Sequence, residues 1–407
     1  MSTGLERIVI VGGGIAGVST AGALRDGGYS DELILVDAGE FPYDRPPLSK
    51  DYLAGEKDLK QIALQSSDWY DNNAIHLRTG IMVTALRPAE GGVELADGTM
   101  LAADRVVLAT GGHAARPPIP GADGPRVHVL RTSEDADRIG AALVPEARIL
   151  VVGAGLIGAE VASTAVDLGC DVTLVDPVAV PVAAAVGHEI AAWLHSQHAA
   201  RGITTLTTQI ESFTDTGSGV EVVIAGETAP RSFDAVLLGV GMVPDTRLAE
   251  AAGLEVDRGI VVDQRQVTSN PAILAVGDPT RIRREGVLAL RTEHWDAAQQ
   301  EGRRAAATIL DAPAPHTTAP WFWTDRHRRH VEGVGHLADA ETIVLRGELG
   351  SEFFSAFGLR SGVVVGAVAV DDSNAVRAAR RMIERGLVVD PQQLADTATD
   401  LRKLLRG

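Results

Sequence analysis

Two glycine-rich turns carry the strongest chemical signals in the sequence. The first, Gly12-Gly13-Gly14-Ile15-Ala16-Gly17, has GxGxxG spacing and follows an apolar segment, Arg7–Val11. Glycines at this spacing permit a tight turn and let backbone N–H groups approach a pyrophosphate closely. Asp37 lies 20 residues beyond Gly17, where a carboxylate can accept hydrogen bonds from ribose hydroxyls. Together these residues predict a dinucleotide site.

A second glycine-rich turn repeats the pattern later in the chain. Gly153-Ala154-Gly155-Leu156-Ile157-Gly158 follows the apolar segment Ile149–Val152, and Asp176 lies 18 residues after Gly158. An acid at the ribose position favours a free 2′-hydroxyl over a 2′-phosphate. The next ten residues, 177–186, contain no arginine that would hold such a phosphate. We therefore expect this turn to take NADH rather than NADPH.

The elements that must position these turns alternate between strand and helix. The order strand, helix, strand is expected around the first turn and again around the second. The expected segments are Arg7–Val11, Ala16–Asp26 and Glu32–Val36, then Ile149–Val152, Ala159–Leu168 and Val172–Val175. Further apolar strands run into glycines at 106–112, 236–241 and 273–278. The order predicts an α/β protein with two parallel sheets covered by helices.

The last 92 residues have a different pattern. Ile343–Arg346, Glu352–Leu359 and Val363–Val370 are typical of antiparallel strands, and helices are expected from Asn374 and from Pro391. We expect a small α+β domain here.

Composition narrows the class of protein. The 407 residues carry a net charge of −17, which argues against a general nucleic-acid binder. The single cysteine, Cys170, excludes a disulfide framework, a CxxC redox pair and a thiolate-held iron–sulfur cluster. The N-terminal residues run directly into the first glycine turn, unlike a signal peptide or a spanning helix, so we expect a cytoplasmic, membrane-free protein.

The histidines predict no metal site. His327 and His330 lack a third ligand at a suitable spacing, and His195 and His198 lie three apart on an expected helix that would suit exposed surface equally well. Cys170 is expected to be a small buried residue.

With two dinucleotide sites, the chain resembles the FAD-dependent pyridine-nucleotide oxidoreductases, and more narrowly the NADH-dependent ferredoxin reductases that serve oxygenases. The resemblance covers nearly the whole chain, and its most specific element is the loop Pro42–Lys50. The other matching segments are Ala109–Gly112, Leu130–Ala136, Gly241–Thr246, Ala275–Asp278, Glu293–Trp295 and Pro320–Trp323.

The resemblance implies two Rossmann-like domains of the glutathione-reductase-like type and a small C-terminal domain. FAD binding would be shared by residues 1–113 and 236–314, NAD binding would occupy 114–235, and the C-terminal domain would be 315–407. The flavin ring would lie between the two nucleotide folds.

The resemblance also assigns cofactor contacts position by position. The residues implied for FAD are Gly12, Gly14, Ile15, Ala16, Gly17, Asp37, Arg45, Lys50, Val83, Ala109, Thr110, Gly111, Arg131, Gly277, Asp278, Glu293, His294, Trp295 and Trp323. Those implied for NADH are Gly153, Gly155, Leu156, Ile157, Gly158, Glu160, Asp176 and Gly241.

Lys50 and Glu160 are the candidate catalytic pair, because the resemblance places such a lysine beside flavin N5 and pairs it with such a glutamate. A buried ammonium would stabilise the negative charge that develops as flavin accepts hydride, and the carboxylate would offset its desolvation. A purely structural ion pair, or no contact at all, remains open. Trp321 and Trp323, two apart on an expected strand, would either pack or shape a path for electrons.

The expected activity is NADH:ferredoxin oxidoreductase. No cysteine pair is available to receive electrons internally, so they would pass singly to an iron–sulfur ferredoxin, [2Fe–2S] in type, that supplies a Rieske oxygenase or a cytochrome P450. Arginines at Arg281–Arg284 and Arg326–Arg329 would dock an acidic partner, unless they are scattered over solvated faces. The alternatives are an NADH oxidase, a rubredoxin or quinone reductase, and an NADH sensor resembling apoptosis-inducing factor.

Overall fold

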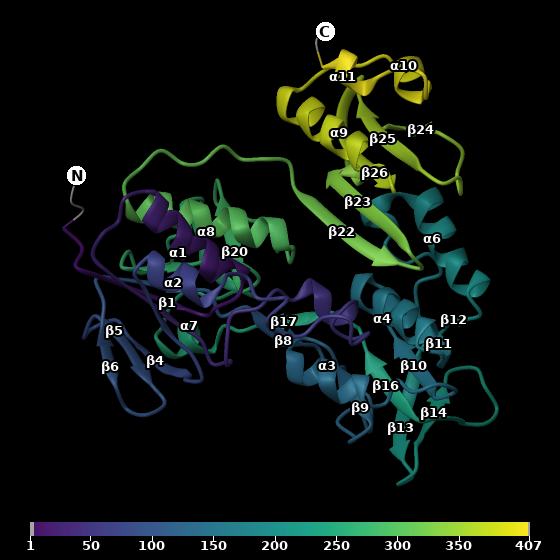
Figure 1. Cartoon of the computed structure of the whole chain (residues 1–407), viewed down its shortest axis with the longest axis horizontal. Coiled ribbons are helices and arrows are strands. Elements are labelled where there is room, and N and C mark those ends of the chain that lie inside the picture. Colours follow the sequence, from purple (N-terminus) through teal and green to yellow (C-terminus); the bar gives the residue numbers. More distant parts are fainter. Residues whose placement is uncertain (1–3, 406–407) are drawn as a thin grey trace. The chain divides into compact units, whose positions relative to one another are not determined.

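The computed structural model describes residues 4–405, which divide into two compact units (Figure 1). Unit 1 comprises residues 4–44, 58–113 and 242–317. Unit 2 comprises residues 45–57, 114–241 and 318–405.

Unit 1 is built on a five-stranded parallel sheet with the strand order β19-β7-β1-β2-β3. Its strands are β1 (Arg7–Val11), β2 (Glu32–Val36), β3 (Ile75–Arg78), β7 (Arg105–Leu108) and β19 (Ile273–Ala275). The apolar residues of β1 and β2 are buried because helices and other strands cover both faces of the sheet.

Two helices, α1 (Ile15–Asp26) and α8 (Trp295–Ile309), lie side by side in unit 1 (Figure 1). Gly302 makes the close approach possible, since a Cβ there would lie 2.6 Å from the Ala16 carbonyl oxygen. The smaller elements of this unit are α2 (Ser67–Asn72), β4 (Val83–Arg87), β5 (Gly92–Leu95), β6 (Met100–Ala102), β8 (Gly112–Ala114), β17 (Met242–Pro244), α7 (Arg247–Ala251), β18 (Ile260–Val262), β20 (Thr280–Arg284) and β21 (Val287–Leu288).

Unit 2 contains a second five-stranded parallel sheet, with the order β12-β11-β10-β16-β9. Its strands are β9 (Val127–Val129), β10 (Arg148–Val152), β11 (Asp171–Asp176), β12 (Thr204–Thr207) and β16 (Ala235–Leu238). The other elements of this part are η1 (Pro46–Ser49), α3 (Ser133–Gly140), α4 (Leu156–Asp167), α5 (Ala183–Val186), α6 (His188–Ala200), β13 (Ile210–Asp215), β14 (Val220–Ile224) and β15 (Arg231–Phe233).

The C-terminal part of unit 2 is an antiparallel sheet of order β22-β23-β26-β25-β24, with helix α9 packed on it (Figure 1). Asp372 caps α9 by accepting a hydrogen bond from the Ala375 N–H, and Gly386 ends it in the left-handed conformation. The elements are β22 (Trp321–Arg326), β23 (Arg329–Gly335), η2 (Leu337–Asp339), β24 (Thr342–Arg346), β25 (Phe354–Arg360), β26 (Val363–Val370), α9 (Ser373–Arg385), α10 (Pro391–Ala395) and α11 (Leu401–Leu404).

The predicted fold class is confirmed: two parallel α/β sheets and a C-terminal α+β domain are present. Two domain boundaries differ from the sequence prediction. β16 pairs with β10 and so belongs to the second sheet, which ends the NAD-side segment at residue 241 rather than 235. Residues 45–57 belong to unit 2, because η1 packs against α3 and α4. Among residues 4–405 no helix is long and apolar enough to cross a bilayer.

Candidate active site

The first glycine turn connects β1 to α1 in unit 1. Gly12 has φ 111°, and a Cβ there would lie 2.2 Å from the Ala109 carbonyl oxygen. A Cβ on Gly17 would lie 2.0 Å from the Gly12 carbonyl oxygen. Both positions therefore require glycine, which lets α1 start directly beside the sheet with its first N–H groups, from Gly14 and Ile15 onward, at the turn.

Asp37 lies at the end of β2 beside this turn. Its carboxylate accepts hydrogen bonds from the N–H groups of Gly13 and Gly39, the latter at 2.7 Å. A carboxylate fixed next to a helix N-terminus fits the ribose and pyrophosphate of a dinucleotide such as FAD.

The remaining FAD residues predicted in unit 1 lie at the ends of strands or at the start of α8. Thr110 Oγ1 donates to the Asp245 carbonyl oxygen at 2.7 Å, next to Gly111. Trp295 Nε1 donates to Asp44 Oδ1 at 2.8 Å and so ties the start of α8 to the loop before η1. Asp278 follows β19, Glu293 pairs with Arg291 at 2.7 Å, and Val83 is buried at the start of β4.

Glu301, which the sequence did not single out, supports the Gly277–Asp278 turn. Its Oε2 accepts hydrogen bonds from the Gly277 N–H at 2.8 Å and from Thr280 Oγ1 at 3.0 Å. Burial raises the pKa of Glu301 to about 7, despite these two donors. His294, the residue before α8, is half-buried, and this desolvation lowers its pKa.

The second glycine turn connects β10 to α4 in unit 2. A Cβ on Gly158 would lie 1.9 Å from the Gly153 carbonyl oxygen, whereas a Cβ on Gly155 would meet nothing within 4 Å. The space beside Gly155 is open at the N-terminus of α4, where Leu156 and the half-exposed Ile157 begin the helix. This arrangement fits the pyrophosphate of a second dinucleotide.

Asp176 ends β11 next to the second turn. Its Oδ2 accepts from the Ala154 N–H at 2.7 Å and its Oδ1 from the Val178 N–H at 2.8 Å. The carboxylate is therefore fixed beside the turn, where the sequence predicts that it distinguishes a ribose 2′-hydroxyl from a 2′-phosphate. Gly241, with φ 103°, ends the segment that follows β16.

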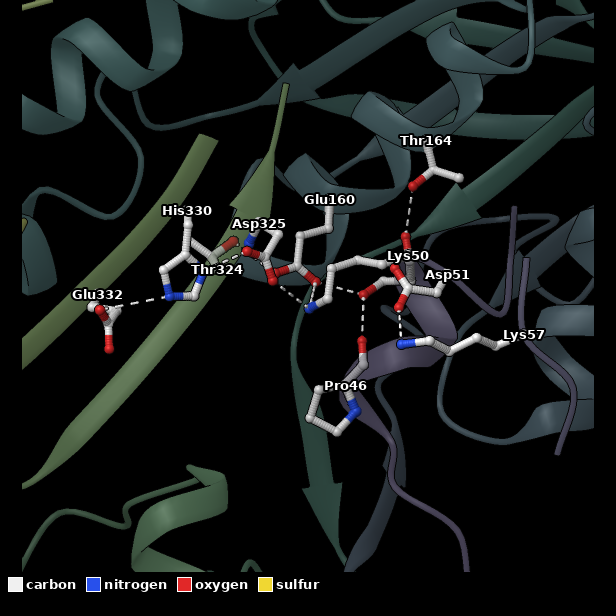
Figure 2. Close-up of polar contacts among 11 residues, drawn as sticks. Pro46, Lys50, Asp51, Lys57, Glu160, Thr164, Thr324, Asp325, His330 and Glu332 are labelled. Atoms are coloured by element: carbon white, nitrogen blue, oxygen red, sulfur yellow. Dashed lines mark hydrogen bonds and ion pairs between the residues drawn. The ribbon is translucent and has the colours of Figure 1, made fainter. Parts of the chain in front are cut away.

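Lys50 and Glu160 lie in contact within unit 2, as Figure 2 shows. Lys50 Nζ is 3.2 Å from Glu160 Oε2, and both side chains are largely buried, with 14% and 6% of their surface exposed. Ser49 Oγ donates to the same carboxylate at 2.5 Å and Thr324 Oγ1 at 2.7 Å, and the Asp325 N–H completes the set at 3.2 Å. Three donors and the Lys50 ammonium therefore hold this buried carboxylate.

Sequence reasoning missed Ser49, Thr324, Asp325 and His330, which surround this pair. Little in the sequence indicates their role: Ser49 precedes Lys50 and Thr324 follows Trp323, and neither belongs to a recognisable motif of its own. The contact depends on β22 meeting α4, which no spacing in the sequence shows.

The two tryptophans of β22 stack on each other. The ring centroids of Trp321 and Trp323 are 4.8 Å apart with an interplanar angle of 23°. Lys50 Nζ lies 5.9 Å from the Trp323 ring centroid, so Trp323 borders the charged pair.

The predicted FAD residues fall in both units. Unit 1 carries those of the first turn, β4, the 109–111 and 277–278 turns and the start of α8, while Arg45, Lys50, Arg131 and Trp323 lie in unit 2 with all the predicted NADH residues. Arg131 directly precedes α3, and its N–H donates to Asp135 Oδ2 at 3.0 Å.

Two of the three arginines at 281–284, the first predicted docking segment, are paired with acids. Arg281 is buried and its Nη1 lies 2.9 Å from Asp257 Oδ2, while Arg283 pairs with Glu255 at 2.5 Å. Both acids precede β18 in the chain, and these ion pairs offset the charges of Arg281 and Arg283.

In the second segment, 326–329, one arginine is buried and another is paired with an acid. Arg326 has 3% of its surface exposed, and burial lowers its pKa to about 10. Arg329 Nε lies 2.9 Å from Asp371 Oδ2, which leaves Arg328 as the exposed arginine of this run. Arg284 and Arg328 are exposed, and docking of a ferredoxin near these two segments stays a prediction.

His198, which suited an exposed surface, is buried instead, next to His327, which is buried as well. His198 Nδ1 and His327 Nε2 are 2.8 Å apart, and the His327 N–H donates to Ser163 Oγ. Burial lowers the pKa of His198 to about 2 and that of His327 to about 4, so the pair is neutral. Within residues 4–405 no three metal-ligating side chains converge. Cys170 is buried, and its thiol donates to the Val144 carbonyl oxygen at 3.4 Å.

Comparison with known proteins assigns the class. Residues 6–302 match the family model described as pyridine nucleotide-disulphide oxidoreductase, and residues 321–405 match the model described as reductase C-terminal. Two glycine turns, two acids and a buried Lys–Glu pair agree with a dinucleotide-dependent oxidoreductase.

Individual relatives narrow the class further. The chain is 36% identical to the ferredoxin–NAD(+) reductase component of an anthranilate 1,2-dioxygenase system from Burkholderia cepacia, over 98% of this chain and 99% of the relative. It superposes on putidaredoxin reductase in a covalent complex with putidaredoxin (TM-score 0.91, 33% identity, 98% of both chains). A ferredoxin reductase for the CYP199A2 system from Rhodopseudomonas palustris also superposes (TM-score 0.91, 31% identity, 98% and 99% of the two chains).

The chain thus belongs to the FAD-dependent NADH:ferredoxin reductases within the pyridine nucleotide-disulphide oxidoreductase family, and the resemblance inferred from its motifs is confirmed.

Proposed function

We propose that the protein takes electrons from NADH, holds them on FAD and passes them singly to an iron–sulfur ferredoxin. The observation that carries the proposal is the place of its only cysteine. Cys170 is buried against Val144, and the residue beside Lys50 is Ser49 rather than a thiol. A family member without a redox-active cysteine must deliver its electrons to an outside acceptor.

The functions of the relatives support a ferredoxin as that acceptor. One relative is the ferredoxin–NAD(+) reductase component of a dioxygenase system, and one solved relative is joined to its ferredoxin. By analogy the acceptor is a [2Fe–2S] ferredoxin that supplies a Rieske oxygenase or a cytochrome P450. A reducing cytoplasm is the proposed location, since the chain relies on no disulfide.

The first glycine turn and Asp37 would hold FAD through its pyrophosphate and ribose, with the 109–111 and 277–278 turns, His294 and Trp295 along the rest of the cofactor. The second turn and Asp176 would hold NADH. When bound, FAD supplies the chemistry that links a two-electron hydride donor to a one-electron acceptor. The protein supplies orientation and electrostatics.

Lys50 would stabilise negative charge on the reduced flavin, while Glu160 keeps its ammonium in place. The geometry supports this division of roles, because Glu160 is fixed by Ser49 and Thr324 as well as by Lys50. Ser49 and Thr324 hold the Glu160 carboxylate independently of Lys50. If the ammonium shifts, the carboxylate therefore stays in place and defines the position to which the ammonium returns.

The test is NADH-driven reduction of cytochrome c, measured with and without a panel of ferredoxins. We expect strong stimulation by at least one [2Fe–2S] ferredoxin and slow turnover with oxygen, a quinone or rubredoxin alone. Equal rates without ferredoxin would favour an oxidase or quinone reductase. A long-lived complex of reduced flavin with NAD⁺, which ferredoxin fails to reoxidise, would favour a sensor.

The role of Lys50 needs its own measurement. Anaerobic stopped-flow reduction of the flavin by saturating NADH should slow by about tenfold or more in Lys50→Met. An unchanged rate would remove Lys50 from the mechanism.

A further inference from the structure

A histidine outside the predicted site completes the charged network around Lys50 (Figure 2). His330 of β23 lies directly opposite Asp325 of β22 in the antiparallel register. Its Nδ1 is 2.5 Å from Asp325 Oδ1, and its Nε2 is 3.6 Å from Glu332 Oε2. One imidazole therefore lies between two carboxylates.

Asp325 connects this histidine to the candidate catalytic pair. While Oδ1 contacts His330, Oδ2 lies 3.7 Å from Lys50 Nζ. Lys50 is therefore placed between Asp325 and the more deeply buried Glu160, which it approaches to 3.2 Å. Two carboxylates compete for one ammonium, and their relative charge determines which one it approaches.

The other charges near His330 are already satisfied. Asp371 of the turn after β26 accepts from the His330 backbone N–H at 2.8 Å, but its second oxygen pairs with Arg329. Glu332 accepts from Trp321 Nε1 at 3.1 Å. Within residues 4–405, Asp325 forms ion pairs with Lys50 and His330.

We propose that His330 is a positioning residue whose positive charge neutralises Asp325 and thereby leaves the Lys50 ammonium on Glu160, where it serves the flavin. This inference rests on the proposed role of Lys50. A neutral side chain at 330 would remove the cation that Asp325 shares with Glu332, and Lys50 would move toward Asp325, in the partly exposed half of the network.

The protonation state of His330 agrees with this role. Hydrogen bonds to Asp325 and Glu332 raise the pKa of His330 to about 10, so the imidazolium persists at neutral pH. The His330–Asp325 contact is partly exposed, with 40% and 39% of the two side-chain surfaces accessible, so solvent weakens but does not abolish the attraction.

The experiment compares His330→Gln with His330→Lys in the FAD-loaded protein. His330→Gln removes the charge, and His330→Lys retains a cation as the matched control. We expect flavin reduction at saturating NADH to slow by about threefold to tenfold in His330→Gln. The midpoint potential of bound FAD should become more negative, since the network gains net negative charge. His330→Lys should restore both quantities to within about twofold of the wild-type rate and close to its potential.

A readout independent of turnover is the ¹⁵N spectrum of the histidine side chains. The resonances that disappear in His330→Gln should report a doubly protonated ring at pH 8. Titration of that ring near pH 6.5 would overturn the proposal, as would unchanged rate and potential in His330→Gln, or failure of His330→Lys to restore them.

Lys50→Met distinguishes this inference from the proposed function. If Lys50→Met alters rate and potential but His330→Gln does not, only the role of His330 is refuted. If neither variant alters them, the proposed role of Lys50 fails and the inference fails with it.

Discussion

The Lys50–Glu160 contact should contribute a measurable coupling energy to the stability of the protein. The perturbation is a double-mutant cycle of Lys50→Met, Glu160→Gln and the double variant. Removing one member of a buried ion pair typically costs 3–5 kcal/mol, because the remaining charge is left without its partner.

The structure reduces that figure for each single change. In Lys50→Met, Glu160 keeps the donors Ser49 Oγ, Thr324 Oγ1 and the Asp325 N–H, so we expect a loss of about 2 kcal/mol. In Glu160→Gln, Lys50 keeps Asp325 as a partner at 3.7 Å, but the NH₂ group of the new amide faces donors that bonded to the carboxylate. We therefore expect the free energy of unfolding to fall by about 3 kcal/mol. The double variant should lose less than the sum, by about 2 kcal/mol.

The assay is denaturant unfolding followed by tryptophan fluorescence, since Trp323 borders Lys50. Lys57 and Asp51 provide the matched control, an ion pair with 45% and 40% of the side-chain surfaces exposed. The corresponding cycle of Lys57→Met and Asp51→Asn should give a coupling below about 0.5 kcal/mol. A coupling that small for Lys50 and Glu160 would refute the view that they form a tightly held pair.

Three further predictions concern other parts of the molecule. Gly17→Ala should abolish stoichiometric FAD binding, measured by flavin absorbance, because the new Cβ would lie 2.0 Å from the Gly12 carbonyl oxygen; near-normal flavin content would refute it. Asp176→Ala should raise the KM for NADH about tenfold with little change in kcat, as steady-state kinetics would show, and an unchanged KM would exclude a ribose contact. Glu301→Gln should stabilise the FAD-free protein by about 2–3 kcal/mol at pH 8 and not at pH 4.5 in denaturant unfolding. The raised pKa keeps this buried acid protonated in the folded state up to about pH 7, whereas it ionises in the unfolded state above about pH 4.5, so the free energy of unfolding of the wild type falls over that interval. Equal effects at the two pH values would contradict it.

The sequence predicted those elements well whose formation depends on neighbouring residues in the chain. The first two strands have the bounds expected from their apolar residues, Arg7–Val11 and Glu32–Val36. Helix α4 begins at Leu156, three residues before the predicted start, because the turn glycines leave the chain free to enter the helix at once. Its N-terminus depends on backbone geometry rather than on apolar periodicity.

The contacts of β22 and β23 could not be predicted in the same way. Their two-residue turn is His327-Arg328, with φ 53° and 61°, whereas such turns usually contain asparagine and glycine. Without a turn signal, the sequence could not predict the register of this hairpin, nor the pairing of Asp325 with His330 that depends on it. The same omission made buried Arg326 look like a surface charge.

The most direct test of the proposed electron path is an anaerobic stoichiometry with the purified FAD-loaded protein. A limiting amount of NADH is added to the protein and an excess of oxidised [2Fe–2S] ferredoxin, and reduced ferredoxin is counted from its absorbance. The proposed path predicts two ferredoxins reduced for each NADH consumed, at a rate that depends on the protein. Rapid oxidation of NADH to a stable reduced flavin, with ferredoxin left oxidised, would contradict it.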